Sequence, residues 1–217
     1  MPEGHGSSEP SGRSRLAARA AEKRQRILAA AKSNFVRHGF GGASVDRIAA
    51  DAGVSKPTIY RYFADKEDLI SAIASGVAEA TLVPAATLGP NASLRATLLK
   101  ACEAAVDAVF SDEVIALHRL AISEFYRFPK LARGYYRNGP RRSLEGVAEM
   151  LDHFRRRGEL EFQDGACAAR DFWSMAFGLA YQDRLIDPDW AMSRDDLLAA
   201  AARGIEHFLA RYGVARH

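Results

Sequence analysis

Apolar residues recur at helical spacing along nearly the whole chain, and signals for β-strands are almost absent. No sustained alternation of apolar and polar residues occurs, and no Asn-Gly or Asp-Gly hairpin turn joins two β-branched runs. Ala, Leu, Arg and Glu dominate instead, with apolar residues three and four positions apart. The sequence therefore predicts an all-α protein.

Helix-capping residues divide the first part of the chain into short helices. One helix carries Ile27 and Phe35 on one face and should end near Gly39. Ser44 is a candidate N-cap for a short second helix, and Gly53 should end that helix. These signals predict two helices separated by a tight connection.

A third and a fourth helix follow closely. Ser55 should cap a helix that runs from Lys56 to about Tyr62, with Pro57 in its first turn, where a missing N–H does no harm. Asp65 should cap the next helix, whose first turn is acidic and therefore favours the helix dipole.

The second and third helices, joined by a turn centred on a glycine, have helix-turn-helix geometry. The second helix of such a pair can enter the major groove of DNA. Its outward side chains can reach base edges, phosphates or a thymine methyl group, and they are Lys56, Pro57, Thr58, Tyr60 and Arg61. A helical hairpin whose polar face is merely solvated has the same spacing, so spacing alone leaves that alternative open.

Positive charge is concentrated near the same segment. Residues 13–61 hold eleven Lys/Arg and three Asp/Glu, a net of +8, whereas the remainder of the 30 basic and 27 acidic residues gives a net of −5. This separation suggests that one segment meets a polyanion, although basic stretches are often only solvated helix faces. Ser44 and Lys66 begin flanking helices, where N–H groups favour phosphate.

The stretch Arg26 to Ile73, RILAAAKSNFVRHGFGGASVDRIAADAGVSKPTIYRYFADKEDLISAI, resembles the N-terminal DNA-binding domain of the TetR family of bacterial transcriptional regulators. The strongest match is AGVSKPTIYRYFADKEDL, in which the turn, the recognition helix and the next cap match together. Pro57 stands where the family commonly has Gly, a change that should alter base reading without changing the fold.

The resemblance also assigns DNA contacts. Residues that match commonly contacting positions are Ser44, Lys56, Thr58, Tyr60, Tyr62 and Lys66, to which Arg47 on the second helix is added. The predicted DNA site consists of these residues together with the cap Ser55 and the outward residues Pro57 and Arg61.

The same resemblance implies a domain organisation. We expect a disordered, basic-ended tail over residues 1–18, a helix-turn-helix domain over residues 19–75, and a helical ligand-binding and dimerisation domain over residues 76–217. The basic segment 13–26 resembles extensions that follow DNA in some family members, and a solubilising tail is equally compatible with its composition.

Two segments near the C-terminus match the paired helices of the family's dimer interface in order and length, residues 165–184 and 194–212. The apolar stretch Phe172–Tyr181 fits burial by a second subunit, and a helix sandwiched within one subunit would have the same pattern. Upstream, the stretch FPKLARGYYRNGP within Phe125–Leu151 resembles, more loosely, the C-terminal domain of an AefR-like subgroup.

A ligand pocket can be predicted only by residue type. Small-molecule sites combine aromatic residues with a few polar groups. The candidates are Phe110, His118, Phe125, Tyr126, Trp173, Phe177 and Tyr181. His118 and Arg119 are candidate polar anchors, and ordinary core packing is the alternative for every one of these residues.

The sequence contains no catalytic constellation, nucleotide-binding loop or metal-ligand spacing, so it predicts no enzyme, no metal and no cofactor. Its two cysteines, Cys102 and Cys167, fit neither a disulfide framework nor a metal cluster. The ten-residue stretch Phe172–Tyr181 is far short of the roughly 20 residues that a bilayer needs. Met1 to Gly12 lacks the apolar run of a secretory signal. We therefore expect a cytoplasmic protein with no membrane partner, associated with the nucleoid when it is bound to DNA.

The predicted function is that of a ligand-responsive, sequence-specific transcriptional regulator, with repression favoured. Its expected partners are a double-stranded DNA operator, a second copy of the chain and an unidentified small-molecule effector. Two alternatives remain: control by a partner protein, or a small-molecule-binding protein whose helix-turn-helix no longer binds DNA. The intact Lys56, Thr58, Tyr60 and Lys66 argue against the second alternative.

Overall fold

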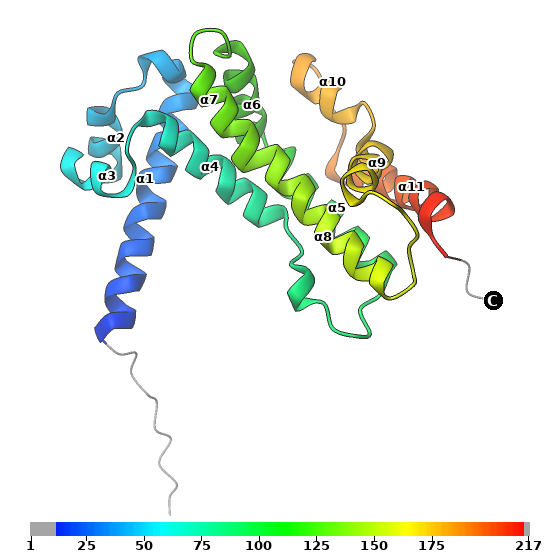
Figure 1. Cartoon of the computed structure of the whole chain (residues 1–217). Coiled ribbons are helices and arrows are strands. Elements are labelled where there is room, and N and C mark those ends of the chain that lie inside the picture. Colours follow the sequence, from blue (N-terminus) through cyan, green and yellow to red (C-terminus); the bar gives the residue numbers. More distant parts are fainter. Residues whose placement is uncertain (1–11, 215–217) are drawn as a thin grey trace, which may run out of the picture. The chain divides into compact units, whose positions relative to one another are not determined.

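The fold is taken from a computed structural model, which describes residues 12–214. The chain is 78% helical, and no strand is found among these residues, which confirms the all-α prediction. The helices of the first part are α1 (Gly12–Gly42), α2 (Val45–Ala52), α3 (Lys56–Tyr62) and α4 (Lys66–Thr81) (Figure 1). They are followed by η1 (Ala85–Thr87), α5 (Leu94–Val109), α6 (Asp112–Ser123), α7 (Pro129–Tyr136), η2 (Arg137–Arg141), α8 (Arg142–Arg156), α9 (Gly165–Phe177), α10 (Ala180–Ile186) and α11 (Arg194–Tyr212).

The chain divides into two compact units, of which the first ends at Lys66 and the second begins at Glu67. This division falls before the predicted boundary at residue 75, because most of α4 packs within the second unit. A Cβ atom at Gly139 of η2 would lie 3.2 Å from the Cβ of Ala74 on α4. The Thr81 hydroxyl of α4 lies 3.1 Å from the Ser143 hydroxyl of α8.

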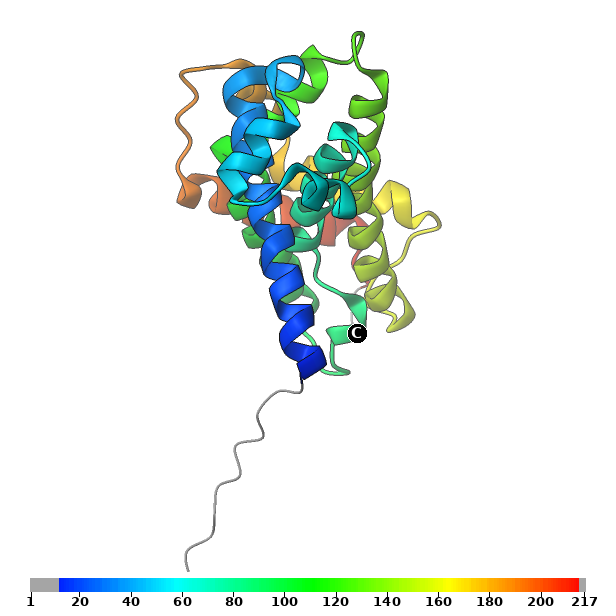
Figure 2. The same cartoon turned by 90° about the vertical axis from the view of Figure 1, so that its left-hand side faces the viewer.

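The first unit begins with a helix longer than the sequence analysis predicted. Residues 12–18, expected in the disordered tail, belong to α1, and Met1 to Ser11 lie outside the described residues. Ala, Leu and Arg form helices readily, which explains a helical turn without buried contacts. Figure 2 shows this part of α1 extending beyond α2 and α3, and its side chains are exposed from Arg15 to Glu22.

A small apolar core holds α1, α2 and α3 together. Ile27, Phe35, Ile48 and Ile59 are each 0–1% exposed. Burying a side chain of this size contributes about 1.5–3 kcal/mol relative to leaving it in water. The backbone of α1 leaves the helical region at Gly39, where φ is 69°, near the predicted end of that helix.

The second unit is built around α5, α8, α9 and α11, whose inward side chains form one continuous core. A Cβ at Gly204 of α11 would collide with the backbone of Met175 and Ala176 on α9, so these two helices approach closely only because of that glycine. Ion pairs between Arg194 and Asp107, with N–O distances from 2.7 Å, link α11 to α5 at the surface.

The predicted single helix over residues 165–184 is broken, which corrects the sequence analysis. Gly178 has φ 50° and ψ −127°, a conformation that L side chains rarely adopt, so α9 ends at Phe177 and α10 begins at Ala180. Phe172 and Phe177 are buried within the chain itself. The apolar character of this segment is therefore largely explained by packing inside one subunit, the alternative that the sequence left open.

A π-helix, η2, joins α7 to α8 and contains Pro140. Proline has no N–H to donate, and the wider π turn carries the chain past it into α8. The chain thus stays helical through the proline, and α8 begins at Arg142, directly after η2.

One stretch of the described chain, Lys66–Thr87, is long and apolar enough to cross a bilayer by length and composition alone, with a third of its most apolar window buried. Core helices of globular proteins pass the same test, and α4 packs within the second unit.

Candidate DNA interface and ligand cavity

The turn between α2 and α3 is fixed by three capping residues. The Ser44 hydroxyl accepts a hydrogen bond from the Arg47 N–H at 3.2 Å and so caps α2. Gly53 ends α2 with φ 62° and ψ 42°, the left-handed conformation that glycine adopts without strain. The Ser55 hydroxyl accepts from the Thr58 N–H and caps α3. The helix-turn-helix thus forms at the three residues that the sequence singled out.

Two polar side chains of α1 fasten this turn to the rest of the unit. The Arg26 guanidinium donates to the carbonyl oxygens of Ala52 and Gly53, at the C-terminal end of α2. The Asn34 amide, only 2% exposed, donates to the Asp51 carboxylate at 2.7 Å. Both contacts fix the position of α2, and with it the orientation of α3, against α1.

Helix α3 buries one side and exposes the other. Ile59 is 1% exposed and belongs to the core, whereas Lys56, Pro57, Tyr60 and Arg61 are exposed. Tyr60 keeps 49% of its surface in solvent. An exposed tyrosine beside exposed cations offers both a hydrogen-bonding tip and charge to a partner surface.

The Lys56 ammonium forms an ion pair with the Asp46 carboxylate of α2 at 3.0 Å. The hydrogen bond to Asp46, and then its charge, raise the pKa of Lys56. Both side chains are largely exposed, so the pair is screened by solvent and can be exchanged for a phosphate contact at little cost.

The Lys66 side chain is used inside the first unit. Its ammonium donates to the carbonyl oxygens of Phe40 and Ala43, each at 2.9 Å, and lies 4.7 Å from the centre of the Phe40 ring. Lys66 therefore caps the C-terminal end of α1, where a cation is favoured by the helix dipole.

The second unit contains a partly open cavity of about 140 Å³, lined by residues of the helices from α4 to α10. Its walls are mainly apolar, with Ile73 of α4, Leu117 of α6, and Phe172 and Phe177 of α9 among them. An apolar cavity of about 150 Å³ binds benzene in another protein. The space is therefore of the size of a single-ring organic molecule.

One hydrogen-bonded pair provides polarity in the wall of the cavity. His118 Nδ1 of α6 lies 2.6 Å from the Tyr181 hydroxyl of α10. Burial lowers the pKa of His118 and raises the pKa of Tyr181 and of Tyr135, whose ring packs edge-on against His118 at 5.5 Å. All three groups are therefore neutral near pH 7.

A second polar contact lies between α4 and α8. The Thr81 hydroxyl donates to the Ala78 carbonyl at 2.8 Å and lies 3.1 Å from the Ser143 hydroxyl. Thr81 is 8% exposed, and both hydroxyl residues line the cavity.

The comparisons with known proteins assign both units to one family. Residues 27–73 match the model of the tetR family of bacterial regulatory proteins, and residues 96–214 match that of the AefR-like transcriptional repressor C-terminal domain. The second match alone spans more than half of the chain. The chain belongs to the TetR family. The regulator is therefore a DNA-binding transcriptional regulator and not an enzyme, and the resemblance to the AefR-like subgroup is confirmed.

Relatives of similar sequence and solved structures of similar fold agree with this assignment. The HTH-type transcriptional repressor SCO4008 of Streptomyces coelicolor is 46% identical over 48 residues, which are 22% of this chain and 25% of that protein. The matches to the first curated relatives span only about a quarter of those relatives' length. A TetR-family transcriptional regulator structure from Mesorhizobium loti has a TM-score of 0.77 and 29% identity, covering 90% of this chain and 99% of that one. The flavonoid-responsive regulator FrrA has a TM-score of 0.70 and 27% identity, covering 90% and 100%.

The predicted DNA-contacting residues of the TetR-like unit lie in different surroundings. Ser44, Arg47 and Ser55 are exposed near the helix starts, together with the outward residues of α3. Thr58 is half-buried, and its hydroxyl lies 2.8 Å from that of Ser55. Tyr62 is half-buried, with the Arg61 guanidinium 5.7 Å from its ring centre. Lys66 differs most from the expectation, because its ammonium is already engaged with backbone carbonyls.

The cavity contains some of the predicted pocket residues and not others. His118, Trp173, Phe177 and Tyr181 line it. Phe110 is buried behind them, with its ring centre 5.2 Å from that of Phe177 and 5.5 Å from that of Tyr181.

The prediction was wrong for Phe125 and Tyr126. These residues are 49% and 94% exposed, and they follow Ser123, the last residue of α6. Sequence reasoning missed Tyr135 and the Thr81–Ser143 pair. The aromatic type of Tyr135 could have suggested it, whereas nothing distinguishes two hydroxyl residues on separate helices.

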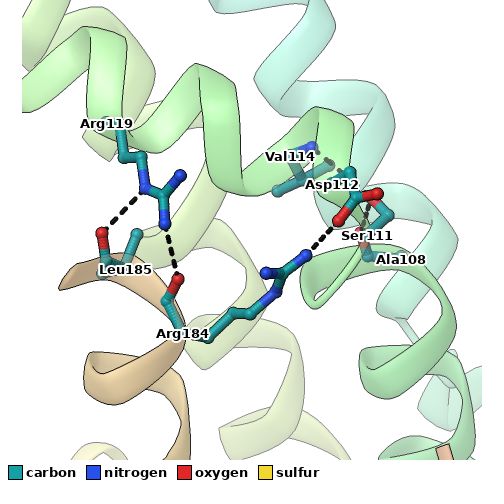
Figure 3. A network of polar contacts seen from close by, with 7 residues as sticks. All are labelled: Ala108, Ser111, Asp112, Val114, Arg119, Arg184 and Leu185. Atoms are coloured by element: carbon teal, nitrogen blue, oxygen red, sulfur yellow. Dashed lines mark hydrogen bonds and ion pairs between the residues drawn. The ribbon is translucent and has the colours of Figure 1, made fainter. Parts of the chain in front are cut away.

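Arg119 does not line the cavity but fixes one of its walls. Its guanidinium donates to the carbonyl oxygens of Leu185 at 2.7 Å and Arg184 at 2.9 Å, at the C-terminal end of α10 (Figure 3). The Arg184 guanidinium in turn pairs with Asp112 at the start of α6. The two arginines hold α10, which carries Tyr181, against α6, which carries His118.

The described residues contain no group of three or more His, Cys, Asp or Glu side chains that could hold a metal ion. Cys102 is buried, and burial raises the pKa of its thiol to about 12, so this cysteine is a core residue. Cys167 is exposed, and its thiol donates to the Asp164 carboxylate, which raises the pKa of Cys167.

Proposed function

We propose that this TetR-family regulator is a repressor that binds a palindromic operator as a homodimer and leaves it when a small molecule fills the cavity of the second unit. The observation that carries the proposal is the exposed side of α3, a capped helix that Arg26 anchors through the preceding turn. No other described part of the first unit covers this side. Ile59, the buried residue of α3, faces the core, and the exposed side chains of Lys56, Pro57, Tyr60 and Arg61 are available to DNA.

The proposed DNA contacts divide into base reading and positioning. Lys56 and Pro57 lie at the N-terminal end of α3, the part of a recognition helix that meets base edges, and Tyr60 lies one turn further along the helix. Ser44 and Arg47, on the preceding helix, are placed to meet phosphates, which fix orientation without reading sequence. The Lys66 ammonium contributes indirectly, by holding the end of α1.

A homodimer would place two such helices in successive major grooves, roughly 34–36 Å apart or somewhat more for a long site. We place the interface on α9 to α11, within the segments 165–184 and 194–212. Leu179 and Ile186, at the two ends of α10, are 70% and 72% exposed, and a partner subunit would remove this apolar surface from water.

Release by a ligand is supported by the path of α4. This continuous helix begins at Lys66, which is anchored to Phe40 and Ala43 in the first unit, and its later residues Ile73 and Thr81 line the cavity. A ligand that binds better to a state with α4 displaced would shift the population toward that state, with a coupling of about 1–3 kcal/mol. FrrA, a similar protein, is named as flavonoid-responsive.

We also propose that the protein acts in the cytoplasm and is associated with the nucleoid while bound to DNA. This proposal rests on the proposed DNA-binding function, since a bacterial operator is accessible to the protein only in the cytoplasm.

Genomic-fragment selection with purified protein at roughly physiological salt tests the function. Salt must be controlled, because phosphate contacts alone give affinity without specificity. We expect a few enriched fragments that share an inverted repeat, and the genes beside them identify the regulated set. If neither the protein as purified nor protein stripped of bound small molecules enriches any fragment, the proposal is wrong.

A further inference from the structure

The cavity of the second unit presents no permanently charged side chain to a ligand. Among the described residues that line it, none is Lys, Arg, Asp or Glu. The only ionisable side chains there are His118, Tyr135 and Tyr181, whose pKa values are shifted by burial toward the neutral forms. An ionised carboxylate or ammonium would lose its hydration and gain no counter-ion, which is costly. An occupant must therefore be uncharged.

The His118–Tyr181 pair leaves one donor hydrogen, whichever tautomer the imidazole adopts. A neutral imidazole has one N–H and a phenol one O–H, and their mutual hydrogen bond at 2.6 Å uses one of these two hydrogens. If Tyr181 donates to Nδ1, the Nε2–H remains. If Nδ1–H donates, the Tyr181 O–H remains. The pair can therefore satisfy an acceptor atom on an occupant.

The Thr81–Ser143 pair has the opposite character. The Thr81 hydrogen is used on the Ala78 carbonyl, so the contact between the two hydroxyls requires Ser143 to donate to the Thr81 oxygen. Both hydroxyl hydrogens are then used within the protein, and only lone pairs remain. The Thr81–Ser143 pair therefore cannot donate a hydrogen bond to an occupant, whereas the His118–Tyr181 pair can.

The volume and the aromatic wall define the rest of the occupant. About 140 Å³ fits a single ring rather than a fused ring system, by comparison with the cavity of about 150 Å³ that takes up benzene. The Trp173 ring centre lies 4.7 Å from that of Phe177 and 5.9 Å from that of Tyr181, and aromatic edges and faces favour an aromatic guest.

We propose that the effector is an uncharged, single-ring aromatic molecule with one oxygen acceptor, bound by a hydrogen bond from the His118–Tyr181 pair. The proposal rests on the proposed function, since it names the ligand class of the same cavity. The arginine contacts between α6 and α10 make this recognition selective, because they hold the two partners at a fixed separation (Figure 3).

Trp173 provides a direct measurement of binding. The chain has two tryptophans, and Trp190 does not line the cavity. In the Trp190→Phe variant, Trp173 alone reports an occupant through its fluorescence, without any DNA present. Failure of ligand binding is thereby distinguished from failure of operator binding, which fragment selection measures separately.

Matched probes isolate each property of the ligand. Anisole and ethylbenzene differ only in an ether oxygen for a methylene group, and we expect anisole to bind roughly two- to tenfold more tightly, the range of one net hydrogen bond. Benzamide should bind, whereas benzoate, of nearly the same shape, should not. Methoxynaphthalene should bind more weakly than anisole. Equal binding of benzoate and benzamide, or tighter binding of the two-ring ether, would overturn the proposed class.

The double variant His118→Leu/Tyr181→Phe removes both partners of the hydrogen bond, so neither is left buried without a hydrogen-bond partner. We expect the preference for anisole over ethylbenzene to disappear in this variant. The matched control is His38→Leu/Tyr126→Phe, which makes the same exchanges at two exposed positions and should keep the preference. A preference that survives in the cavity variant contradicts the assigned donor. The benzamide–benzoate comparison uses the unaltered cavity. It therefore tests whether the ligand must be uncharged even if the double variant does not fold.

Discussion

In the first unit the groups assigned to function are exposed on one side of α3, whereas in the second they line a partly open and mainly apolar cavity. A surface site of the first kind is specified locally, since two serine caps and one glycine set the helix that presents it. A cavity of the second kind depends on how eight elements pack together, so small changes far from its lining residues can abolish it. We therefore expect substitutions that disturb packing to have their largest effects in the second unit. Substitutions of polar side chains should matter most in the first unit.

The largest expected effect is a packing change in the second unit. In Gly204→Val, side-chain atoms would collide with the backbone of Met175 and Ala176, which cannot move aside as a side chain could. We expect a loss of at least about 3 kcal/mol in the free energy of unfolding, at the upper end of overpacking effects. Urea unfolding followed by circular dichroism measures this loss.

The matched control is Gly76→Ala on α4, where a Cβ would meet nothing within 4 Å. Because alanine is the better helix former, this change should stabilise the protein by up to about 1 kcal/mol. A Gly204→Val protein as stable as the unaltered chain would show that α9 and α11 are not packed as described.

A smaller effect is expected from the polar anchor of the first unit. Arg26→Met keeps most of the side-chain length but removes the donors to the Ala52 and Gly53 carbonyls. We expect about 1 kcal/mol of lost stability and a matching loss of operator affinity, because α3 is then less rigidly placed. Thermal unfolding and operator titration measure the two quantities. Arg19→Met, at an exposed position of the same helix, is the stability control, and an equal effect from both variants would contradict an anchoring role.

The cavity should also respond to pH through His118. Burial lowers the pKa of His118 in the folded protein, so between that value and about 6.5 the unfolded chain binds the proton more readily. Stability is therefore retained above about pH 6.5 and falls as the pH drops toward the folded pKa. Urea unfolding at about pH 7.5 and about pH 5.5 measures the loss, which should be smaller in His118→Gln. An identical loss in that variant would assign the pH dependence to other groups.

The smallest effect is expected at the ion pair beside α3. Asp46→Asn removes the carboxylate that competes with phosphate for the Lys56 ammonium. We expect tighter binding to DNA of unrelated sequence, by up to about fivefold at low salt, with the difference fading as salt rises. Fluorescence anisotropy over a salt series tests this expectation, and weaker binding by the variant would mean that Asp46 supports the DNA-bound arrangement.

The sequence was informative about the first unit because its signals are local. Ser44, Gly53 and Ser55 act on hydrogen bonds within a few residues of themselves, and each capped or ended the expected helix. The uses of Lys56 and Lys66 could not be predicted, since Asp46 and the Phe40 carbonyl approach them only after the unit has folded.

Less of the second unit could be predicted, because core and cavity residues have the same composition. The residue types of His118 and Tyr181 suggested a pocket, but their hydrogen bond depends on the packing of α6 against α10. Gly178 could have indicated that α9 ends before α10 begins. Because the residues on both sides of it are apolar, the sequence was interpreted as one continuous helix. Phe125 was misassigned because its aromatic type does not distinguish an exposed position after α6 from a position in the cavity wall.

The central claim is that the exposed side of α3 reads an operator, and the double variant Lys56→Ala/Tyr60→Ala tests it most directly. Its matched control, Lys130→Ala/Tyr126→Ala, removes the same two side-chain types at exposed positions of the second unit. Binding to a selected fragment, measured against unrelated DNA at the same salt, should keep its specificity in the control. In the α3 variant we expect that specificity to be lost, with the fold and the oligomeric state unchanged. Unimpaired specific binding by the α3 variant would contradict the account.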